Sequence, residues 1–486
     1  MASAQRFPSR LLSRRFARNQ EEMKSLKSTF SIFLLFLFSL GQTKAQSKEE
    51  LSYQEYIQNI LLFHPLAQSI KLNEQNAELQ NMVSKGLLDP LFYTDFANKN
   101  FNEKEYYSTV SSKLVIPTTY GVDFVAGYNY NRGYFLNPYD NTNSDVLWNI
   151  GIEANLLQGF RNNERSIGIQ QTALYAQQFL NQSKLQLNNL IYSATLEYLN
   201  WQALYQMQNI YQENLELSME YAKQTKVLYQ GGEKTAMDTE EAEIYLQKAK
   251  NELEKNSYYL LKATAGVESY LWYNSGSLKL AQNTVPQRQI PQWNIPEPNA
   301  NDIANNPFLL EYQQKIALSK LEQTLKAEKL KPKLKLKYNP LFSNLNPSGF
   351  NGLQNYTFGL ELTTPILFRA EKAQVQLGEL KIDALEFELA NKTRELEIKL
   401  ENNLALQEKL KTINEISAKN IVGYKKLLDG EIELYKFGES SVFLLNKRQE
   451  SYITEKIKFL ETQLQLNIER LTYTFLNQTL DADPSL

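Results

Sequence analysis

The sequence is built as two copies of one plan, and this repeat constrains the fold more than any other feature. Pro90 and Pro332 end similar segments and lie 242 residues apart. Farther along, GIEANLLQGFR at 151–161 matches GLELTTPILFR at 359–369 at a separation of 208 residues. Ordered self-similarity of this kind marks a repeated structural unit. The chain therefore has two equivalent halves, and the first half carries about 34 extra residues between these two landmarks.

Each half begins with a helix that an X-Pro pair opens. Pro65 follows His64 and Pro307 follows Asn306, again 242 residues apart. Proline fits the first helical position because its missing N–H is not needed there, and Asn306 is a good cap residue. We therefore interpret His64, the only histidine of the chain, as a structural residue at a helix start and not as a catalytic group.

Alternating segments follow these helices in both halves. Apolar and aromatic residues occupy every second position at 122–130, 146–154, 333–338 and 355–363, and most residues between them are polar or small. Strands of about ten residues with one apolar and one polar face are typical of transmembrane barrels. An ordinary antiparallel sheet of a soluble domain would show the same alternation, so both interpretations stay open on the strands alone.

Very long helices come next, at about 163–229 and 369–435. Each has more than 60 residues, which corresponds to about 100 Å at about 1.5 Å per residue. Apolar residues recur in both at alternating spacings of four and three, which predicts coiled-coil seams. The seam residues are Leu187, Ile191, Ala194, Tyr198 and Trp201 in the first helix, and Ala373, Leu377, Leu380, Ala384, Phe387, Ile421, Tyr424 and Leu428 in the second.

A glycine turn ends each long helix. YQGGEKTA at 229–236 and YKFGESSV at 435–442 share a Tyr-x-x-Gly-Glu pattern at a separation of 206 residues. Glycine permits the backbone conformation that a reversal between two helices requires. We expect a helical hairpin at each turn. The first returning helix is too short to pair with its whole partner, so the X-Pro helix of the next half should supply the remaining length.

The N-terminus is typical of an exported protein. A positively charged start precedes an apolar run at 30–41, and small residues lead to Ala45. These are the parts of a secretory signal peptide, and the run is too short to span a bilayer comfortably as a helix. We expect cleavage after Ala45, with Met23 competing with Met1 as the true start. Any membrane insertion of the remaining chain is expected to use strands.

Composition excludes several classes of function. The 52 Lys and Arg residues balance 54 Asp and Glu residues, so no net field attracts nucleic acid. The absence of cysteine excludes disulfides, thiolate metal sites and a lipid-bearing N-terminal cysteine. No Walker loop, dinucleotide fingerprint or catalytic constellation is present. We expect neither an enzyme nor a cofactor, and no metal site.

The order of these features resembles the TolC family of outer-membrane efflux and secretion channels over residues 50–478. The predicted signal peptide comes first. Five features then follow in the same order twice: an X-Pro helix, a strand pair, an LLQGFR or PILFR helix start, a Tyr-x-x-Gly turn and a shorter helix. The resemblance implies a mainly α fold with β: a trimeric transmembrane β-barrel of twelve strands, four from each chain, continued by a periplasmic α-helical coiled-coil barrel.

The same resemblance implies function and partners. It describes a homotrimer in outer-membrane lipid that extends into the periplasm and serves as a passive exit duct. A periplasmic adaptor protein and an inner-membrane transporter would deliver the cargo, and no nucleic acid is involved. A periplasmic or surface coiled-coil scaffold with a small β domain is the alternative. The sequence does not identify the cargo.

Candidate site residues follow from the resemblance. The two glycine turns would be the adaptor-docking tips, formed by Gln230, Gly231, Gly232, Glu233, Lys436, Phe437, Gly438 and Glu439. Many family members narrow the periplasmic aperture with acidic residues nine and twelve positions after the second turn's tyrosine. Here Tyr435 is followed at those positions by Leu444 and Lys447, and the first half has Asp238 and Glu241. We expect a less acidic aperture, or one bordered by this first-half pair, although both carboxylates could equally serve a helix start.

The expected organisation has five parts. Residues 1–45 form the extension and signal peptide, 46–285 the first repeat (strands about 91–157, helical hairpin about 163–272), 286–300 a proline-rich equatorial linker, 301–478 the second repeat (strands about 333–364, helical hairpin about 369–476) and 479–486 the tail. The extra residues of the first repeat suggest an additional hairpin at 106–131. It would lie outside the barrel or enter it and give six strands per chain, and the sequence leaves both options open.

Overall fold

The structure is a computed structural model that describes residues 49–480 except 139, 141–143, 275, 282, 290–302 and 344–351. The predicted signal peptide, most of the proline-rich linker and the end of the tail lie outside the described residues. The chain divides into two compact units, Met1–Glu50 with Ala281–Val285 and Leu51–Leu280 with Pro286–Leu486. The second unit contains nearly all the described elements, and the following paragraphs concern it.

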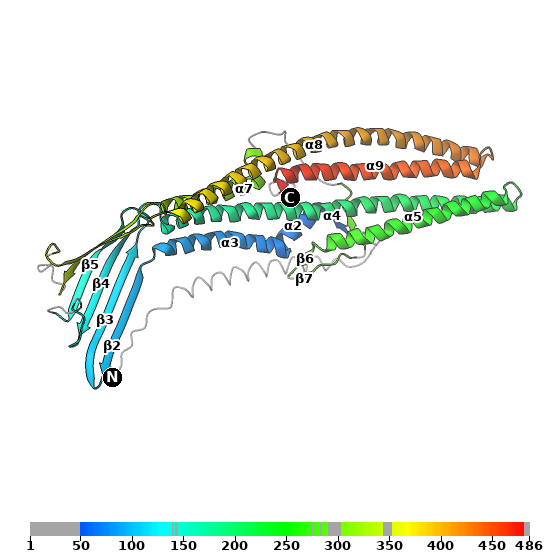
Figure 1. The fold of residues 1–486 in the computed structure, drawn as a ribbon. Coiled ribbons are helices and arrows are strands. Elements are labelled where there is room, and N and C mark those ends of the chain that lie inside the picture. The colour runs from blue at the N-terminus through cyan, green and yellow to red at the C-terminus, as the bar shows by residue number, and fades with distance from the viewer. Residues whose placement is uncertain are drawn as a thin grey trace, which may run out of the picture. The chain divides into compact units, whose positions relative to one another are not determined.

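The elements that both halves share, which are an X-Pro helix, strands, a long helix and a shorter returning helix, occur in the same order (Figure 1). The first half contains β1 (Glu50–Leu51), α2 (Tyr53–Phe63), α3 (Pro65–Lys85), the 3-10 turn η1 (Gly86–Leu88), β2 (Leu91–Phe101), β3 (Lys104–Pro117), β4 (Val122–Arg132), β5 (Val146–Asn155), α4 (Glu164–Gln230), α5 (Ala236–Glu268), β6 (Trp272–Tyr273), β7 (Gly276–Ser277) and β8 (Val285–Pro286). The second half contains α7 (Pro307–Glu328), β9 (Lys333–Phe342), β10 (Tyr356–Thr363), α8 (Arg369–Lys436) and α9 (Val442–Leu476).

Six strands form one antiparallel sheet in the order β10-β9-β5-β4-β3-β2. The extra residues of the first half form the hairpin β3–β4, which lies between β2 and β5 in this sheet. The sheet of one chain therefore has six strands, and not the four that the family resemblance implied. The physical reason is that β3 and β4 carry the same alternation as the other strands and hydrogen-bond to neighbours on both sides.

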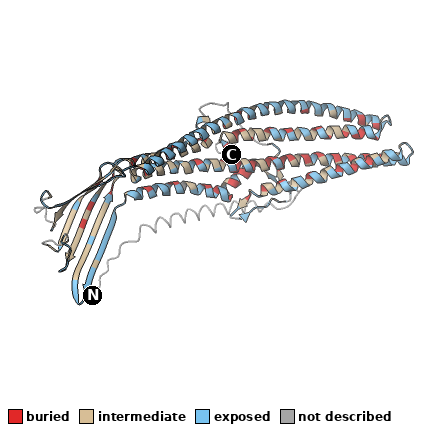
Figure 2. Ribbon diagram, viewed as in Figure 1, coloured by how far each residue is buried: buried red, intermediate tan, exposed pale blue. Residues whose placement is uncertain are grey.

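The strand register separates the two faces of the sheet. Phe124 lies opposite Ile116 on one side and Ile152 on the other, and Ile152 lies opposite Tyr338. The same face, called the apolar face below, includes Phe92, Phe96, Val110, Leu114, Tyr128, Trp148, Ile150, Leu336, Phe358, Leu360 and Leu362. Much of this face is uncovered in the described chain, and Figure 2 shows that the sheet is mainly exposed or intermediate.

The long helices form the two predicted hairpins. α4 has 67 residues and α8 has 68, and they pack along α5 and α9 respectively. α3 packs on α4, and α7 packs on both α8 and α4. Figure 1 shows α3 beyond the end of α5 and α7 beyond the end of α9, so each X-Pro helix extends the returning helix of its own half. The expectation that the X-Pro helix of the next half completes the first hairpin is wrong, because α3 already lies along the rest of α4. Figure 1 shows the sheet at one end of these helices and the two turns at the other. No helix in the described part of the chain is both long and apolar enough to cross a membrane.

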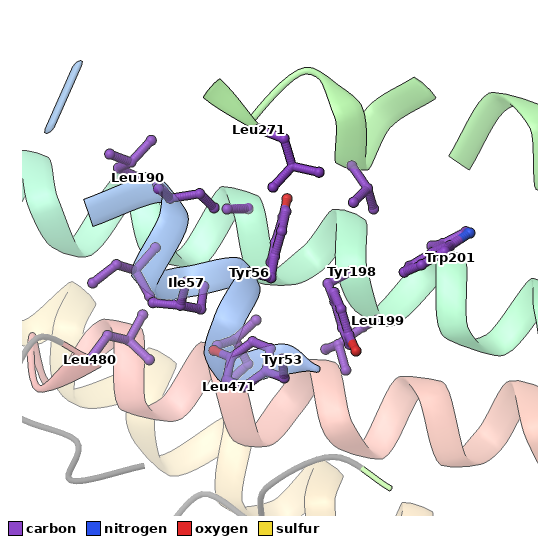
Figure 3. Packing of buried hydrophobic residues seen from close by; sticks show 14 of the residues in the cluster. Tyr53, Tyr56, Ile57, Leu190, Tyr198, Leu199, Trp201, Leu271, Leu471 and Leu480 are labelled. Carbon is purple, nitrogen blue, oxygen red and sulfur yellow. The ribbon is translucent and has the colours of Figure 1, made fainter. Parts of the chain in front are cut away.

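The largest hydrophobic core lies where α2 meets α4, α5 and α9 (Figure 3). Tyr198 and Trp201 of α4 are almost fully buried there, beside Tyr53 and Tyr56 of α2. The first predicted seam is therefore a core seam. The part of the second predicted seam from Ala373 to Phe387 is not buried by other described residues of this chain, and Phe387 itself is 77% exposed. The described residues of the same chain do not cover that stretch.

The two X-Pro helices are capped in the same way. His64 Nδ1 accepts a hydrogen bond from the Leu66 N–H at 3.2 Å, and Asn306 Oδ1 accepts one from the Phe308 N–H at 2.9 Å. His64 is buried, and desolvation lowers its pKa below 6.5, which keeps Nδ1 free to accept. The structural interpretation of His64 is confirmed by this geometry.

This cap predicts a pH effect. Below about pH 6.5 the unfolded chain binds a proton at His64 before the folded chain does, so stability should fall as the pH falls through the interval down to the lowered pKa. His64→Asn copies the cap of Asn306 and should remove this loss while leaving stability near pH 7 almost unchanged. Thermal unfolding of both proteins between pH 5 and 7, the range in which an unperturbed histidine changes charge, measures the difference. Equal pH dependence in the two proteins would contradict it.

Candidate functional site

The two hairpin turns have the same backbone geometry. Gly232 and Gly438 adopt φ values of +85° and +76°, which favour glycine. The Glu233 N–H donates to the Leu228 carbonyl and the Glu439 N–H to the Leu434 carbonyl, both at 2.9 Å. This bond across six residues is the Schellman type of helix ending. The prediction that glycine serves the chain reversal is confirmed at both turns, and all eight residues predicted as docking tips are exposed.

A small set of contacts joins the two hairpins beside these turns. The hydroxyl groups of Thr225 in α4 and Tyr435 in α8 lie 2.8 Å apart and are buried. Lys234 Nζ donates to the Ser440 carbonyl at 3.0 Å and lies 4.9 Å from the centre of the Tyr435 ring. Burial raises the pKa of Tyr435 further above its ordinary value, at which the hydroxyl is already protonated near neutral pH. We call Thr225, Lys234 and Tyr435 the tip contact.

The tip contact breaks the symmetry of the repeat. Tyr229 occupies in the first half the place that Tyr435 occupies in the second. Tyr435 is only 4% exposed because it packs against the first hairpin, whereas Tyr229 is 45% exposed. The surface that would cover Tyr229 in a symmetric arrangement is therefore not supplied by the described part of this chain.

Among the predicted aperture residues, Asp238 has a clear structural role. Its Oδ2 accepts hydrogen bonds from the Thr235 N–H at 2.9 Å and the Thr235 hydroxyl at 2.7 Å. These bonds form a capping box at the start of α5. They lower the pKa of Asp238, the backbone N–H contributing most. The carboxylate is thus charged and fixed beside the turn, close enough to Tyr435 to act on its pKa.

The remaining aperture candidates lie within the first two turns of α5 and α9. Glu241 is half-buried on α5, while Leu444 and Lys447 are exposed on α9. Lys447 Nζ lies 3.4 Å from Glu450 Oε2, and Glu450 also pairs with Lys248 of α5. These ion pairs lower the pKa of Glu450, the Lys248 hydrogen bond having the largest effect. The structure therefore places charges of both signs near the second turn.

Sequence reasoning missed a buried polar contact farther from the tips. The side chain of Gln449 in α9 is fully buried, and its Nε2 donates to Asn214 Oδ1 at 2.8 Å and to Ser218 at 3.3 Å. Asn214, Ser218, Tyr221 and Thr225 follow one another at spacings of four, three and four. This is the spacing of the apolar seams, and a search that included polar residues would have found the contact.

The polar face of the sheet carries a charged cluster. Glu153 of β5 accepts hydrogen bonds from Lys113 of β3 at 2.7 Å and from Lys335 of β9 at 2.8 Å. Arg165, at the start of α4, contacts both carboxylate oxygens of Asp123 of β4, at 2.5 and 3.3 Å. The first cluster joins the strands of the two halves, and the second fixes the helix start to the sheet.

Comparison with known proteins places this architecture. No family model and no curated protein matches the sequence. Solved structures do match: the open state of the MtrE outer membrane channel of Neisseria gonorrhoeae (14% identity, 90% of this chain and 93% of that one, TM-score 0.63), the CmeC outer membrane channel of Campylobacter jejuni (11%, 87% and 85%, 0.63) and the outer membrane protein VceC of Vibrio cholerae (10%, 87% and 95%, 0.62).

The chain has the TolC-like fold. The matches extend over 87–90% of the chain, so the fold expected from the sequence is confirmed. The TolC-like arrangement explains why the strands and the turns lie at opposite ends of the long helices. It does not explain the hairpin β3–β4. This hairpin adds two strands to the four per chain that the resemblance implied.

Proposed function

We propose that the protein is the outer-membrane channel of a tripartite efflux or type I secretion system. It would act as a passive homotrimeric duct that extends into the periplasm and receives its cargo from an inner-membrane transporter through a periplasmic adaptor. The observation that carries this proposal is the two-faced sheet that leads directly into the long helices. The TolC-like fold supports it.

The apolar face of the sheet fits a lipid environment. Phe358 is 61% exposed, and Phe92, Phe96, Leu360 and Leu362 are exposed to a similar degree. Soluble monomers rarely expose a large contiguous apolar surface, and these five side chains all lie on one face of the sheet. The opposite face carries Glu153, Lys113 and Lys335, as the water-filled interior of a barrel requires.

The open edges of the sheet favour a trimer. Within the described residues, β2 and β10 each have a sheet partner on one side only. Unpaired backbone groups cannot face lipid, so the sheet must close against other copies. The exposed seam around Phe387 and the uncovered Tyr229 point the same way, because both need a neighbour that the described chain does not provide.

Salt and alkali washes of isolated membranes test this function. A lipid-embedded barrel should resist both treatments, because it is held by burial of its apolar face. A periplasmic or surface scaffold with a small β domain should be released. Release of the protein would contradict the channel and favour the scaffold.

The tip contact should hold the periplasmic end closed. Tyr435→Phe removes the hydroxyl that bonds to Thr225, at a cost of about 1 kcal/mol in each chain. Thr225 keeps its own bond to the Tyr221 carbonyl at 2.8 Å, so the loss is confined to the contact between the hairpins. We expect a larger fraction of open channels in planar bilayers.

Tyr229→Phe is the matched control for this prediction. Tyr229 occupies the equivalent position in the first half but is exposed. Its hydroxyl takes no part in the tip contact of its own chain, so its removal should not weaken that contact. An open fraction that does not rise in Tyr435→Phe would contradict the role of the tip contact, and an equal rise in Tyr229→Phe would show that Tyr229 makes a similar contact with a neighbouring copy.

The acidic pair of the first half should affect ion selectivity. Asp238→Asn together with Glu241→Gln removes two carboxylates per chain beside the turn, and we expect weaker cation preference and weaker block by multivalent cations. The helix cap at Thr235 accounts for part of the role of Asp238, so a modest loss of stability is also expected. Reversal potentials in asymmetric salt measure the selectivity. Unchanged selectivity and block would show that the pair serves only the helix start.

A further inference from the structure

We propose that all six strands of each copy enter the barrel wall, and that β2 of one copy pairs with β10 of the next in the register that joins β9 to β5 within one chain. This inference rests on the proposed function, since it assumes a closed trimer in the membrane. Three copies would then form an eighteen-stranded barrel in place of the twelve-stranded one that the resemblance implied.

The first argument is the position of the hairpin β3–β4. β3 pairs with β2 from Lys104 to Val115, and β4 pairs with β5 from Val122 to Tyr130. β2 has no other strand partner in the described sheet, so it is attached to the other strands only through this hairpin. A hairpin that lay outside the wall would detach β2 from the wall as well.

The second argument is that the edge strands β2 and β10 are equivalent in the repeat to β9 and β5, which pair with each other where the two halves meet. A shift of 242 residues places Phe92, Thr94 and Phe96 of β2 on Leu334, Leu336 and Tyr338 of β9. A shift of 208 residues places Ile152 and Glu153 of β5 on Leu360 and Glu361 of β10. Both shifts keep apolar residues on the apolar face. The edge strand β2 therefore corresponds to β9, and the edge strand β10 corresponds to β5, the two strands that pair where the halves meet.

The register between copies follows from this equivalence. Within one chain, Ile152 lies opposite Tyr338 and Ala154 lies opposite Leu336. Transferred to the edges, Leu360 of one copy lies opposite Phe96 of the next, and Leu362 lies opposite Thr94. Six alternating strands also make β2 and β10 run in opposite directions, so their pairing is antiparallel like every other pairing in the sheet.

The enlarged wall has a functional consequence. Barrel diameter grows roughly in proportion to strand number, so eighteen strands give a barrel about 1.5 times as wide as twelve. A barrel of this size leaves an aqueous channel. The width of the duct at the outer membrane would then allow larger solutes than a twelve-stranded relative allows.

A cysteine pair tests the joint between copies. The natural chain has no cysteine, so any disulfide in Phe96→Cys/Leu360→Cys is an engineered one. β2 and β10 lie on opposite edges of the sheet, so a link between these positions must join two copies. We expect covalent trimers after mild oxidation in membranes. Ala97→Cys/Leu360→Cys is the control, because Ala97 lies on the polar face and should not form the link.

The outcomes separate this inference from the proposed function. One such outcome is a trimer, identified by native mass measurement, that does not cross-link through the Phe96–Leu360 pair. Another is a trimer that cross-links equally through the control pair. Either result would contradict the proposed pairing of β2 with β10 but would not contradict the proposed channel. Absence of any trimer in the membrane would overturn the proposed function itself.

Two neighbouring serines test whether β3 lies in the wall. Ser111 lies on the polar face, where its hydroxyl donates to Asn129 at 2.8 Å, and Ser112 lies on the apolar face opposite Thr94. In the intact membrane, a charged thiol reagent should label Ser111→Cys through the lumen and should not label Ser112→Cys in lipid. Equal labelling of both would show that the hairpin stands in water outside the wall and would overturn the eighteen-stranded barrel.

Discussion

Phe358→Arg should strongly reduce the amount of assembled channel in the outer membrane. Phe358 lies in β10 on the apolar face and is 61% exposed in the single chain. An arginine facing lipid costs up to about 2–4 kcal/mol, with the largest cost at the middle of the bilayer, and a trimer contains three of them. Heat-stable trimers in outer-membrane fractions, measured by electrophoresis without boiling, should fall to a small fraction of the wild-type amount.

Thr357→Arg is the matched control in the neighbouring position. Thr357 lies on the polar face, opposite Asn339, and an arginine there would extend into water. We expect trimer levels close to those of the natural protein. If both variants assemble equally well, the apolar face does not contact lipid and the barrel is contradicted; if both fail, the strand does not have two distinct faces.

Tyr198→Ala should cause the largest loss of stability in the helical part. The Tyr198 ring packs on Tyr53, Tyr56 and Trp201 with ring centres 5.3–5.7 Å apart, and the side chain is fully buried. Removal of a buried aromatic ring typically costs about 3–5 kcal/mol, because the surrounding side chains only partly fill the cavity. The temperature at which helical circular dichroism is lost should fall clearly in detergent.

Tyr198→Phe separates the ring from the hydroxyl. The hydroxyl donates to the Leu51 carbonyl at 2.7 Å and accepts from the Gln287 N–H at 3.1 Å. Its removal leaves these groups without that partner, which costs about 1–3 kcal/mol. We expect an intermediate melting temperature. A Phe variant as unstable as the Ala variant would show that the hydrogen bonds, and not the ring packing, dominate this core.

Much of the helical architecture could be predicted from the sequence because its signals are local. The glycines at 232 and 438 need positive φ values, and the cap residues His64 and Asn306 precede prolines, so each signal specifies its own conformation. The seam from Leu187 to Trp201 also identified core residues correctly. These features depend on neighbours within a few turns of the same helix.

The remaining features depend on partners that the sequence does not identify. Alternation in 106–131 predicted a hairpin but not its position, because strand pairing is set by contacts between distant segments and the same alternation fits any neighbour. The seam around Phe387 has the spacing of a core seam but remains exposed in one chain. Tyr229 and Tyr435 have the same local sequence pattern, and only the packing of the hairpins distinguishes them.

The mass of the intact particle extracted from outer membranes in detergent tests the central claim most directly. Native mass spectrometry, or light scattering corrected for detergent, should give a particle of three chains from membranes that have resisted salt and alkali washing. A single chain, a dimer or a protein released without detergent would contradict the trimeric channel. The strands would then belong to a small sheet on a coiled-coil scaffold.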